Sequence, residues 1–177
     1  MNRNNNTILG TIVNPGNYSF FGKITSQSDT DLDSAFGAGD GLMGIAYDCI
    51  IENAKGGSAA DTIVGNSSGN KLYGGSGAGV KDILTGNGGA DIFICSVSDA
   101  STDINIADII TDFSNGTDKI GLEDKTFSDL TITQVSSGFF SGDVQIKDTS
   151  SNKILFLIDD TVVVLIDADD FIVTDFV

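Results

Sequence analysis

Residues 56–94 read GGSAADTIV, GNSSGNKLY, GGSGAGVKDILT and GNGGADIFI, and they form four consecutive units of one repeat. Each unit begins with glycine, has Asp or Asn at its sixth position and has a large apolar residue at its eighth, once a three-residue insertion in the third unit is set aside. The sixth residues are Asp61, Asn70, Asp82 and Asp91, and the eighth residues are Ile63, Leu72, Leu84 and Phe93. A nine-residue repeat of this kind is typical of a parallel β-roll, so these residues decide the fold.

The repeat matches the pattern G-G-x-G-x-D-x-U-x, in which U is large and apolar and which is typical of calcium-binding rolls. The glycine-rich half can turn tightly and direct backbone carbonyls inward. The sixth residue adds a carboxylate, which suits a hard cation that takes six or more oxygen ligands at about 2.3–2.6 Å. The last three residues form a short strand whose eighth side chain points into the core. The residues expected to supply calcium ligands are Gly56, Gly57, Ala59, Asp61, Asn70, Gly74, Gly75, Gly77, Asp82, Gly86, Gly88, Gly89 and Asp91.

Successive units should turn on opposite sides of the roll, so that two units make one coil and calcium lies between turns n and n+2. Asp61 would then face Asp82, and Asn70 would face Asp91. Asn70 offers a neutral amide oxygen, Ala59 replaces a glycine of the pattern, and the insertion enlarges the third turn. We therefore expect one good calcium site and one or two weaker ones. A metal-free region of Gly- and Asp-rich loops is the open alternative.

The charge balance excludes several classes of function. The chain has 177 residues, with 25 acidic and 9 basic side chains and a formal net charge of −16. Nucleic acids and anionic membrane surfaces need Lys and Arg to neutralise phosphate, so neither is an expected partner. There is no histidine, which excludes a His-ligated zinc ion, a Ser-His-Asp triad and a Cys-His dyad. Self-repulsion at this charge is costly unless cations bind.

The beginning of the chain and its two cysteines carry less information. Residues 1–13 hold one arginine and a short apolar run, which is not typical of a cleaved secretory signal. No stretch approaches the roughly 18 apolar residues that span a bilayer, so membrane insertion is not expected. Cys49 and Cys95 could form one disulfide or stay as buried thiols, and so small a number favours thiols.

After residue 120 the pattern changes to strands of five to eight residues. The ranges 130–135, 143–147, 154–158 and 162–166 are predicted strands, separated by polar turns that favour antiparallel pairing at one end of the roll. After Lys153 there is no basic residue, whereas aspartates accumulate. This last stretch is either a solvated acidic edge or an uncleaved export signal.

Several blocks outside the repeats resemble one known family. They are IIENAKGG at 50–57, ADIITDF at 107–113, GTDKI at 116–120, and DFIV and DFV at 170–173 and 175–177. The first three are similar to the start and the end of the C-terminal β-roll domain of serralysin-type secreted metalloproteases, in the repeats-in-toxin group. The last two resemble the acidic and hydrophobic terminus of proteins exported by type I ABC systems. The likeness covers residues from about 45 to 177.

The resemblance implies further roles. Glu52 would bind the first calcium ion alongside Asp61, and Asp108 would cap the last site, although either could be a solvated carboxylate. Protease activity is not implied, because the H-E-x-x-H zinc motif of that family needs histidines. The resemblance implies a secreted, extracellular, monomeric protein whose partners are calcium ions and a type I ABC exporter. The chain is either a short protein of its own or a fragment of a longer one.

Together these observations predict an all-β fold in three parts of one compact domain. Residues 1–49 form an N-terminal strand region, residues 50–95 form the parallel roll, and residues 96–177 form an antiparallel cap with the export signal. The expected function is a non-catalytic module that folds on binding Ca²⁺. Two alternatives remain: a structural, adhesive or partner-binding module that accompanies a separate secreted enzyme or protease, and a carboxylate-dependent glycoside hydrolase or lyase.

Overall fold

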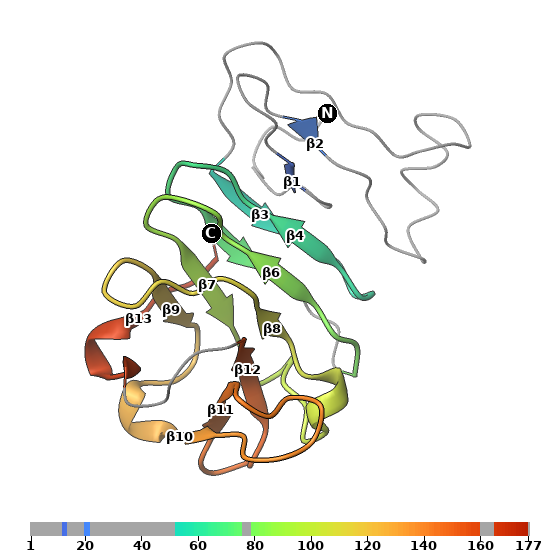
Figure 1. Cartoon of the computed structure of the whole chain (residues 1–177), viewed down its shortest axis with the longest axis vertical. Helices are drawn as coiled ribbons and strands as arrows, with labels where there is room; N and C mark the ends of the chain where they lie inside the picture. Colours follow the sequence, from blue (N-terminus) through green and yellow to red (C-terminus); the bar gives the residue numbers. More distant parts are fainter. Residues whose placement is uncertain (1–11, 14–19, 22–51, 76–78, 160–164, 177) are drawn as a thin grey trace.

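The computed structural model describes residues 12–13, 20–21, 52–75, 79–159 and 165–176. Within these residues the fold is all-β, with short 3₁₀ turns and no α-helix, which confirms the predicted fold class (Figure 1). From residue 53 onward the described strands are two to five residues long. Their stacking, rather than any single long element, positions the candidate site.

Two groups of strands build the molecule. The roll contains β3 (Asn53–Lys55), β4 (Thr62–Val64), β5 (Lys71–Tyr73), β6 (Ile83–Thr85), β7 (Ile92–Cys95), β8 (Ile109–Ile110) and β9 (Lys119–Leu122). The later strands are β10 (Leu130–Gln134), β11 (Val144–Asp148), β12 (Ile154–Ile158) and β13 (Phe171–Val173). Near the N-terminus, β1 (Ile12–Val13) pairs antiparallel with β2 (Phe20–Phe21). The 3₁₀ turns are η1 (Ile104–Ile106), η2 (Phe127–Asp129) and η4 (Ala168–Asp170).

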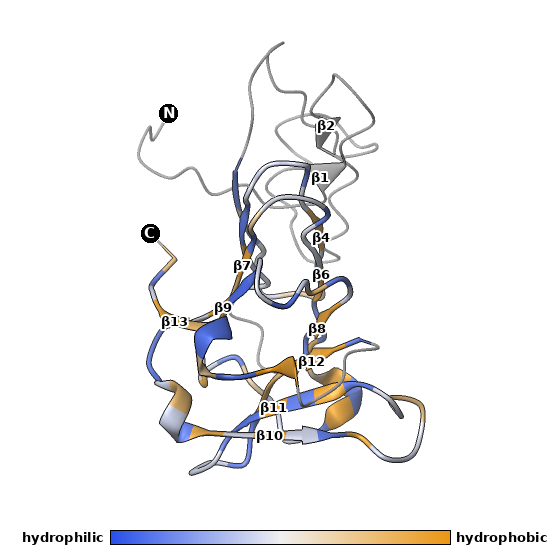
Figure 2. Ribbon diagram, turned by 60° about the vertical axis from the view of Figure 1, so that its left-hand side comes forward, coloured by the Kyte–Doolittle hydropathy of each residue, from blue (hydrophilic) through white to orange (hydrophobic). Residues whose placement is uncertain are grey.

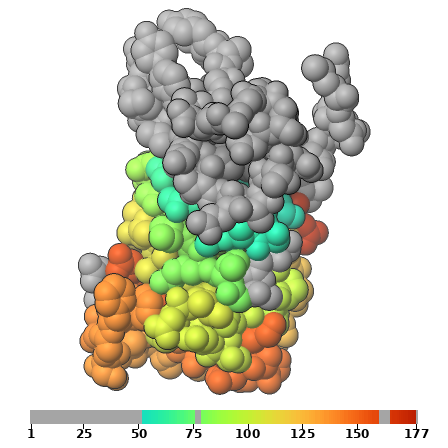
Figure 3. Space-filling model, turned by 90° about the vertical axis from the view of Figure 1, so that its right-hand side faces the viewer, coloured from blue at the N-terminus to red at the C-terminus, as the bar shows by residue number. Residues whose placement is uncertain are grey.

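The roll strands alternate between two sheets. The five-stranded sheet has the order β13-β9-β7-β5-β3, and the six-stranded sheet has the order β10-β11-β12-β8-β6-β4. Pairing is parallel from β3 to β13 in the first sheet and from β4 to β12 in the second. This confirms that two repeat units make one coil, and Figure 3 shows the coils from residue 52 onward as successive bands of colour.

The eighth residue of each repeat fills the space between the sheets. Ile63, Leu72, Leu84 and Phe93 are all completely buried, as the repeat predicted. Residues that pair with them continue the same rows, since Leu84 lies beside Ile110 and Phe93 beside Ile120. All five residues of β12 are buried as well, and β12 is hydrophobic along its length in Figure 2.

The later strands close one end of the roll. β10, β11 and β12 form an antiparallel meander, which confirms strands at 130–135, 143–147 and 154–158 to within a residue or two. The strand predicted at 162–166 is wrong in its described part, because Leu165 lies in a 3₁₀ turn and Ile166 is not extended in a sheet. The capping box between Asp167 and Asp170 fixes the next turn, η4, and interrupts the extended backbone. Residues 162–164 lie outside the described residues.

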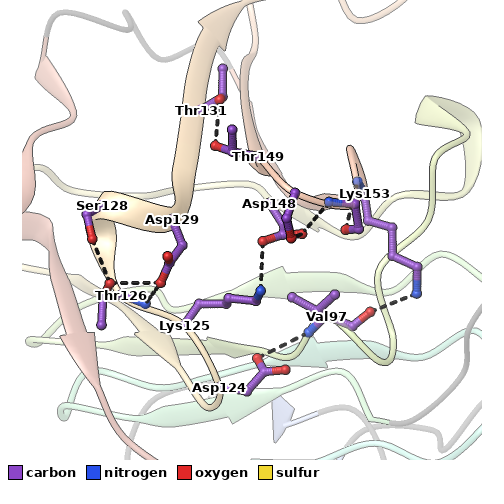
Figure 4. Close-up of polar contacts among 12 residues, drawn as sticks. Val97, Asp124, Lys125, Thr126, Ser128, Asp129, Thr131, Asp148, Thr149 and Lys153 are labelled. Atoms are coloured by element: carbon purple, nitrogen blue, oxygen red, sulfur yellow. Dashed lines mark hydrogen bonds and ion pairs between the residues drawn. The ribbon is translucent and has the colours of Figure 1, made fainter.

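A polar network around the buried Asp148 ties this cap to the roll (Figure 4). Asp148 accepts hydrogen bonds from the Ser150 hydroxyl and the Ser151 amide, both at 2.7 Å, and pairs with Lys125 Nζ at 3.0 Å. Lys153 Nζ donates to the carbonyl of Val97 at 2.9 Å. The bonds from both serines and Lys125 hold the pKa of Asp148 well below its usual range.

Parallel pairing extends beyond residue 95, because β8, β9, β12 and β13 all continue the two stacks. Residues 1–49 lie almost entirely outside the described residues, and so does Cys49. The division into three parts therefore stays a prediction. Cys95 is a buried, free thiol in the described part of the chain.

Replacing Phe93 with alanine should destabilise the chain by about 3–5 kcal/mol, because it leaves a cavity in the completely buried row beside Phe113. Urea unfolding at a fixed calcium concentration measures the change. The matched control is Phe139→Ala, since Phe139 is 94 % exposed and its loss should change stability by no more than about 0.5 kcal/mol. Equal effects of the two substitutions would contradict the assigned core.

Candidate metal centre

The first column of acidic side chains stands where the chain enters the six-stranded sheet. Asp61, Asp82 and Asp108 each precede a strand of that sheet, and we call them the first ladder. The Asp61 amide donates to Asp82 Oδ1 at 2.8 Å, and the Asp82 amide donates to Asp108 Oδ1 at 2.9 Å. The Gly57 amide donates to Asp61 Oδ2 at 2.7 Å. Asp82 and Asp108 thus each accept a hydrogen bond from the backbone of the preceding coil, and Asp61 and Asp82 lie in adjacent coils.

The second ladder, Asn70, Asp91 and Asp118, stands where the chain enters the five-stranded sheet. The Asn70 amide donates to Asp91 Oδ1 at 2.7 Å, and the Asp91 amide donates to Asp118 Oδ1 at 3.0 Å. Asn70 Oδ1 accepts from the Asn66 amide at 2.7 Å, in the role that a carboxylate oxygen has in the first ladder. The geometry of the two ladders is therefore the same, but their charge differs by one.

Glycine begins each turn because oxygen atoms occupy the space of a side chain. A Cβ on Gly56 would lie 2.0 Å from the carbonyl oxygen of Gly74 and 2.4 Å from Asp61 Oδ2. A Cβ on Gly86 would lie 2.3 Å from Asp91 Oδ2. Carbonyl and carboxylate oxygens from successive coils therefore converge beside the first glycine of a unit.

The remaining predicted turn residues are placed as follows. Gly75 and Gly89 have positive φ angles of 115° and 108°, which L-residues rarely adopt. The Gly88 amide donates to the carbonyl of Asn66 at 3.2 Å, and Ala59 lies half-buried in the first turn. Gly77 lies outside the described residues.

Burial makes these carboxylates hard to ionise. Burial, followed by the charge of Asp108, raises the pKa of Asp82 to about 8. Burial likewise raises the pKa of Asp108 to about 7 and that of Asp91 to about 6. Burial also raises the pKa of Asp118. The charge of Lys81 lowers the pKa of Asp108 and that of Lys119 lowers the pKa of Asp118, but burial outweighs both effects.

Two buried carboxylate oxygens have no hydrogen-bond partner among the described residues. One is Asp148 Oδ1, which forms the ion pair with Lys125, and the other is Asp91 Oδ2, the oxygen that faces Gly86. A buried polar atom without a partner costs free energy, and a carboxylate oxygen can accept a cation as well as a proton. Asp91 Oδ2 is thus suited to be a metal ligand.

The donor set fits a hard cation that takes oxygen ligands. Among the described residues, no three His, Cys, Asp or Glu side chains converge on one point. A cation here must therefore use backbone carbonyls in addition to one or two carboxylates, as Ca²⁺ commonly does. The nearby carbonyl oxygens belong to Gly57, Gly74 and Gly86, in turns that the sequence analysis assigned to calcium.

Glu52 and Asp108 occupy different positions in the ladders. Asp108 ends the first ladder beside Asp82. Glu52 precedes β3 in the five-stranded sheet, and its backbone carbonyl accepts from the Lys71 amide at 2.7 Å and from Asn70 Nδ2 at 3.4 Å. The structure thus places Glu52 beside the second ladder, whereas Asp61 begins the first, and the Glu52 side chain is exposed.

Two acceptor residues were missed from the sequence. Asp118 continues the second ladder, and Asp112 accepts from the amides of Gly86 at 2.8 Å and Asn87 at 2.7 Å. A signal for Asp118 was present, since residues 116–120 read GTDKI and keep the G-x-D-x-U half of the repeat. Asp112 follows a strand rather than preceding one, so the repeat pattern has no position for it.

The sequence model of the family described as Peptidase M10 serralysin C terminal matches residues 17–175. The chain belongs to this family. The serralysin C-terminal domain is a non-catalytic accessory module of secreted metalloproteases, and no catalytic domain is detected in the chain. A comparison with curated proteins gives no match. Among the described residues, no helix has the length and apolar composition needed to cross a membrane.

The metal-free serralysin module should lose stability as pH rises from about 4 to about 8. The folded chain keeps protons on Asp82, Asp91 and Asp108 that the unfolded chain, with carboxyl pKa values near 3.9, has already released. The stability that these protons confer is present below pH 4 and is lost as pH rises through the folded pKa values. Urea unfolding of the chelator-treated chain at several pH values measures this slope.

The substitution Asp82→Asn should flatten the slope, because it removes the group with the highest of these pKa values. Asp148 is the internal contrast: its pKa is lowered, so its contribution is lost only at acidic pH. A metal-free stability that stays constant or rises between pH 4 and 8 would contradict the electrostatics assigned to the ladders.

Proposed function

We propose that this serralysin C-terminal module binds Ca²⁺ in the turns of its roll, folds when calcium binds outside the cell, and has no catalytic activity of its own. The observation that carries the proposal is the pair of ladders, in which buried carboxylates with raised pKa values lie beside the carbonyls of glycine turns. Calcium would supply positive charge to carboxylates whose ionisation burial opposes.

The ligands follow from the ladders and from the glycine turns. Asp61 and Asp82, with carbonyls of the turns that begin at Gly56 and Gly74, form the stronger proposed site. Asp91 forms a weaker one, because its neighbour Asn70 is uncharged. Asp108 and Asp118 end the two ladders and would bind the last ions. The exposed side chain of Glu52 lies at the start of the second ladder and would supply a calcium ligand on that side of the roll.

Folding and binding would be coupled through charge. Without a cation, ionised ladder carboxylates repel one another, and this repulsion favours the unfolded chain. A ligand that binds only the folded state stabilises it by about 2.7 kcal/mol at a hundredfold excess over its dissociation constant. Extracellular calcium modules have dissociation constants on the order of 10⁻⁴–10⁻³ M. The chain would then be unfolded where calcium is scarce and folded where it is abundant.

Export would precede this folding. The stretch from 165 to 176 is rich in aspartate and apolar residues, and it has the composition of an uncleaved signal for a type I ABC exporter. The module would act outside the cell as a monomer, alone or with a separate secreted protease. The 1–49, 50–95 and 96–177 division describes its proposed parts: an edge region, the calcium roll and the cap with its signal.

Calcium titration of the purified chain, followed by calorimetry and far-ultraviolet circular dichroism, tests this function. Wild type should show saturable binding and a gain of β-structure. Asp82→Asn should weaken binding about tenfold or more, because a charged oxygen ligand is lost from a buried site. Asp169→Asn is the matched control, since Asp169 is exposed in η4, and it should leave binding unchanged.

Full β-structure without any heat of binding would contradict the proposal. The turns would then be a metal-free scaffold, and a partner-binding function would take its place. The observation that favours this second function is Phe139, which is 94 % exposed in the loop between β10 and β11. A glycosidase or lyase is less well supported, because each ladder carboxylate already accepts a hydrogen bond from backbone.

Asn70→Asp should tighten calcium binding on the second ladder and destabilise the metal-free chain. The substitution replaces an amide oxygen with a carboxylate, and it also removes the Asn70 Nδ2 donor that reaches the Glu52 carbonyl. Calorimetry with calcium, and urea unfolding with chelator, measure the two effects. Thr133→Asp adds the same charge on an exposed position of β10 and should produce neither change. If Asn70→Asp binds calcium like wild type, the second ladder is not a calcium site.

A further inference from the structure

The segment that follows β13 lies against the five-stranded sheet, and we call residues 174–176 the strap. The Thr174 amide donates to the carbonyl of Leu122 on β9 at 3.1 Å. The Phe176 amide donates to Glu123 Oε1 at 3.3 Å. The strap continues from β13 and is thus hydrogen-bonded to the neighbouring strand β9 and to the residue that follows it.

The far end of the strap contacts the first two coils of the described roll. The Phe176 ring lies 6.1 Å from the Tyr73 ring, between centroids. Lys55 Nζ and Lys71 Nζ lie 6.0 Å and 5.8 Å from the Phe176 centroid, and Lys71 Nζ also donates to the carbonyl of Asp175. An ammonium group near an aromatic face is attracted by the ring quadrupole. Two lysines and a tyrosine therefore form a receptor for this aromatic residue.

Burial on the outer face of the sheet supports the same contact. Leu72 and Phe93 point into the core, so the residues next to them, Tyr73 and Ile94, point away from it. Tyr73 is nevertheless only 5 % exposed and Ile94 only 1 % exposed, and neither belongs to a core cluster. Something must cover them from outside.

The register relates the strap to the row of residues that contains Tyr73 and Ile94. Lys55, Tyr73, Ile94 and Gly121 pair in one row across β3, β5, β7 and β9. A Cβ on Gly121 would lie 2.8 Å from Thr174 Cγ2, so glycine leaves the room that the strap needs. The strap contacts both ends of this row, with Thr174 beside Gly121 and Phe176 beside Tyr73 and Lys55.

We propose that the folded roll holds the strap as an internal ligand, so that the acidic and aromatic segment 170–176 is available to a partner only while the chain is unfolded. The receptor residues come from different coils, and they form one surface only when those coils are stacked. This inference rests on the proposed function, in which the partner is the exporter. Folding after export would then withdraw the exported segment from further recognition.

An antibody fragment raised against a synthetic peptide of residues 165–176 tests the proposal on the full chain. Its affinity is measured for the free peptide, for the folded chain and for the chain unfolded in urea, with circular dichroism recorded on each sample. Folded wild type should bind about tenfold or more weakly than the peptide. Urea should restore the affinity. Equal binding to folded chain and peptide would overturn the proposal.

The double variant Lys55→Ala/Lys71→Ala leaves the antibody epitope intact and removes the receptor charges. Folded, it should bind the fragment about tenfold more tightly than folded wild type. Lys147→Ala removes a lysine from β11 and should behave as wild type. A folded double variant that binds no better than wild type would overturn the proposal.

Hydrogen exchange on wild type provides a readout that needs no variant. The amides of Thr174 and Phe176 should exchange at rates close to those of β9, because the same folded unit protects them. Exchange at the rate of an unstructured peptide would overturn the proposal. If calcium leaves the circular dichroism unchanged, the proposed calcium-dependent folding is contradicted. Protection of the Thr174 and Phe176 amides in the folded chain still tests whether the roll holds the strap.

Discussion

The stacking of one carboxylate above another is the constraint on which the rest of this structure depends. Equivalent residues on neighbouring strands of a sheet lie about 4.8 Å apart. The repeat places the sixth residue of every second unit at the same point of that stack, so Asp61, Asp82 and Asp108 form one ladder. The register that buries Ile63 beside Leu84 also brings these carboxylates together. The register that forms the core therefore also creates repulsion between the stacked carboxylates.

The chain compensates for this repulsion only in part. Asp82 and Asp91 each accept a backbone amide, which lowers the pKa, but burial outweighs that bond. Burial is the largest cause of both shifts, and the pKa reaches about 8 for Asp82, which lies between two carboxylates, and about 6 for Asp91, which has Asn70 on one side. Because Asn70 is uncharged, it reduces the repulsion in the metal-free chain, but it also weakens the site that a cation would use. Stability without metal and affinity for metal thus oppose each other at one residue.

The sequence predicted what the repeat controls directly. Strands, their alternation between two sheets and the burial of eighth residues such as Leu72 all follow from a nine-residue period. The position of Glu52 beside the second ladder could not be predicted from the repeat. Its assignment came from the resemblance, and only the alternation of strands between the two sheets shows which ladder a residue joins. The turn at Leu165 was missed because local hydrogen bonds of the next turn, begun by Asp167, outweigh the β-propensity of an apolar run. The contacts of the strap could not be predicted from the sequence, because they join residues about a hundred positions apart.

The strap and the ladders both act on the same stack of coils. In a simple solenoid each coil contacts only its neighbours, so coils can separate one at a time. Here Phe176, which follows the last strand, contacts Lys55 and Tyr73 of the first two described coils, and the intervening β7 and β9 cannot leave the stack without breaking that contact. Repulsion in the ladders favours opening between any two coils, and the strap couples such an opening to the others. Under the proposed function, a cation that closes one ladder would therefore stabilise the position of the strap as well, and folding of the roll would be a single cooperative event.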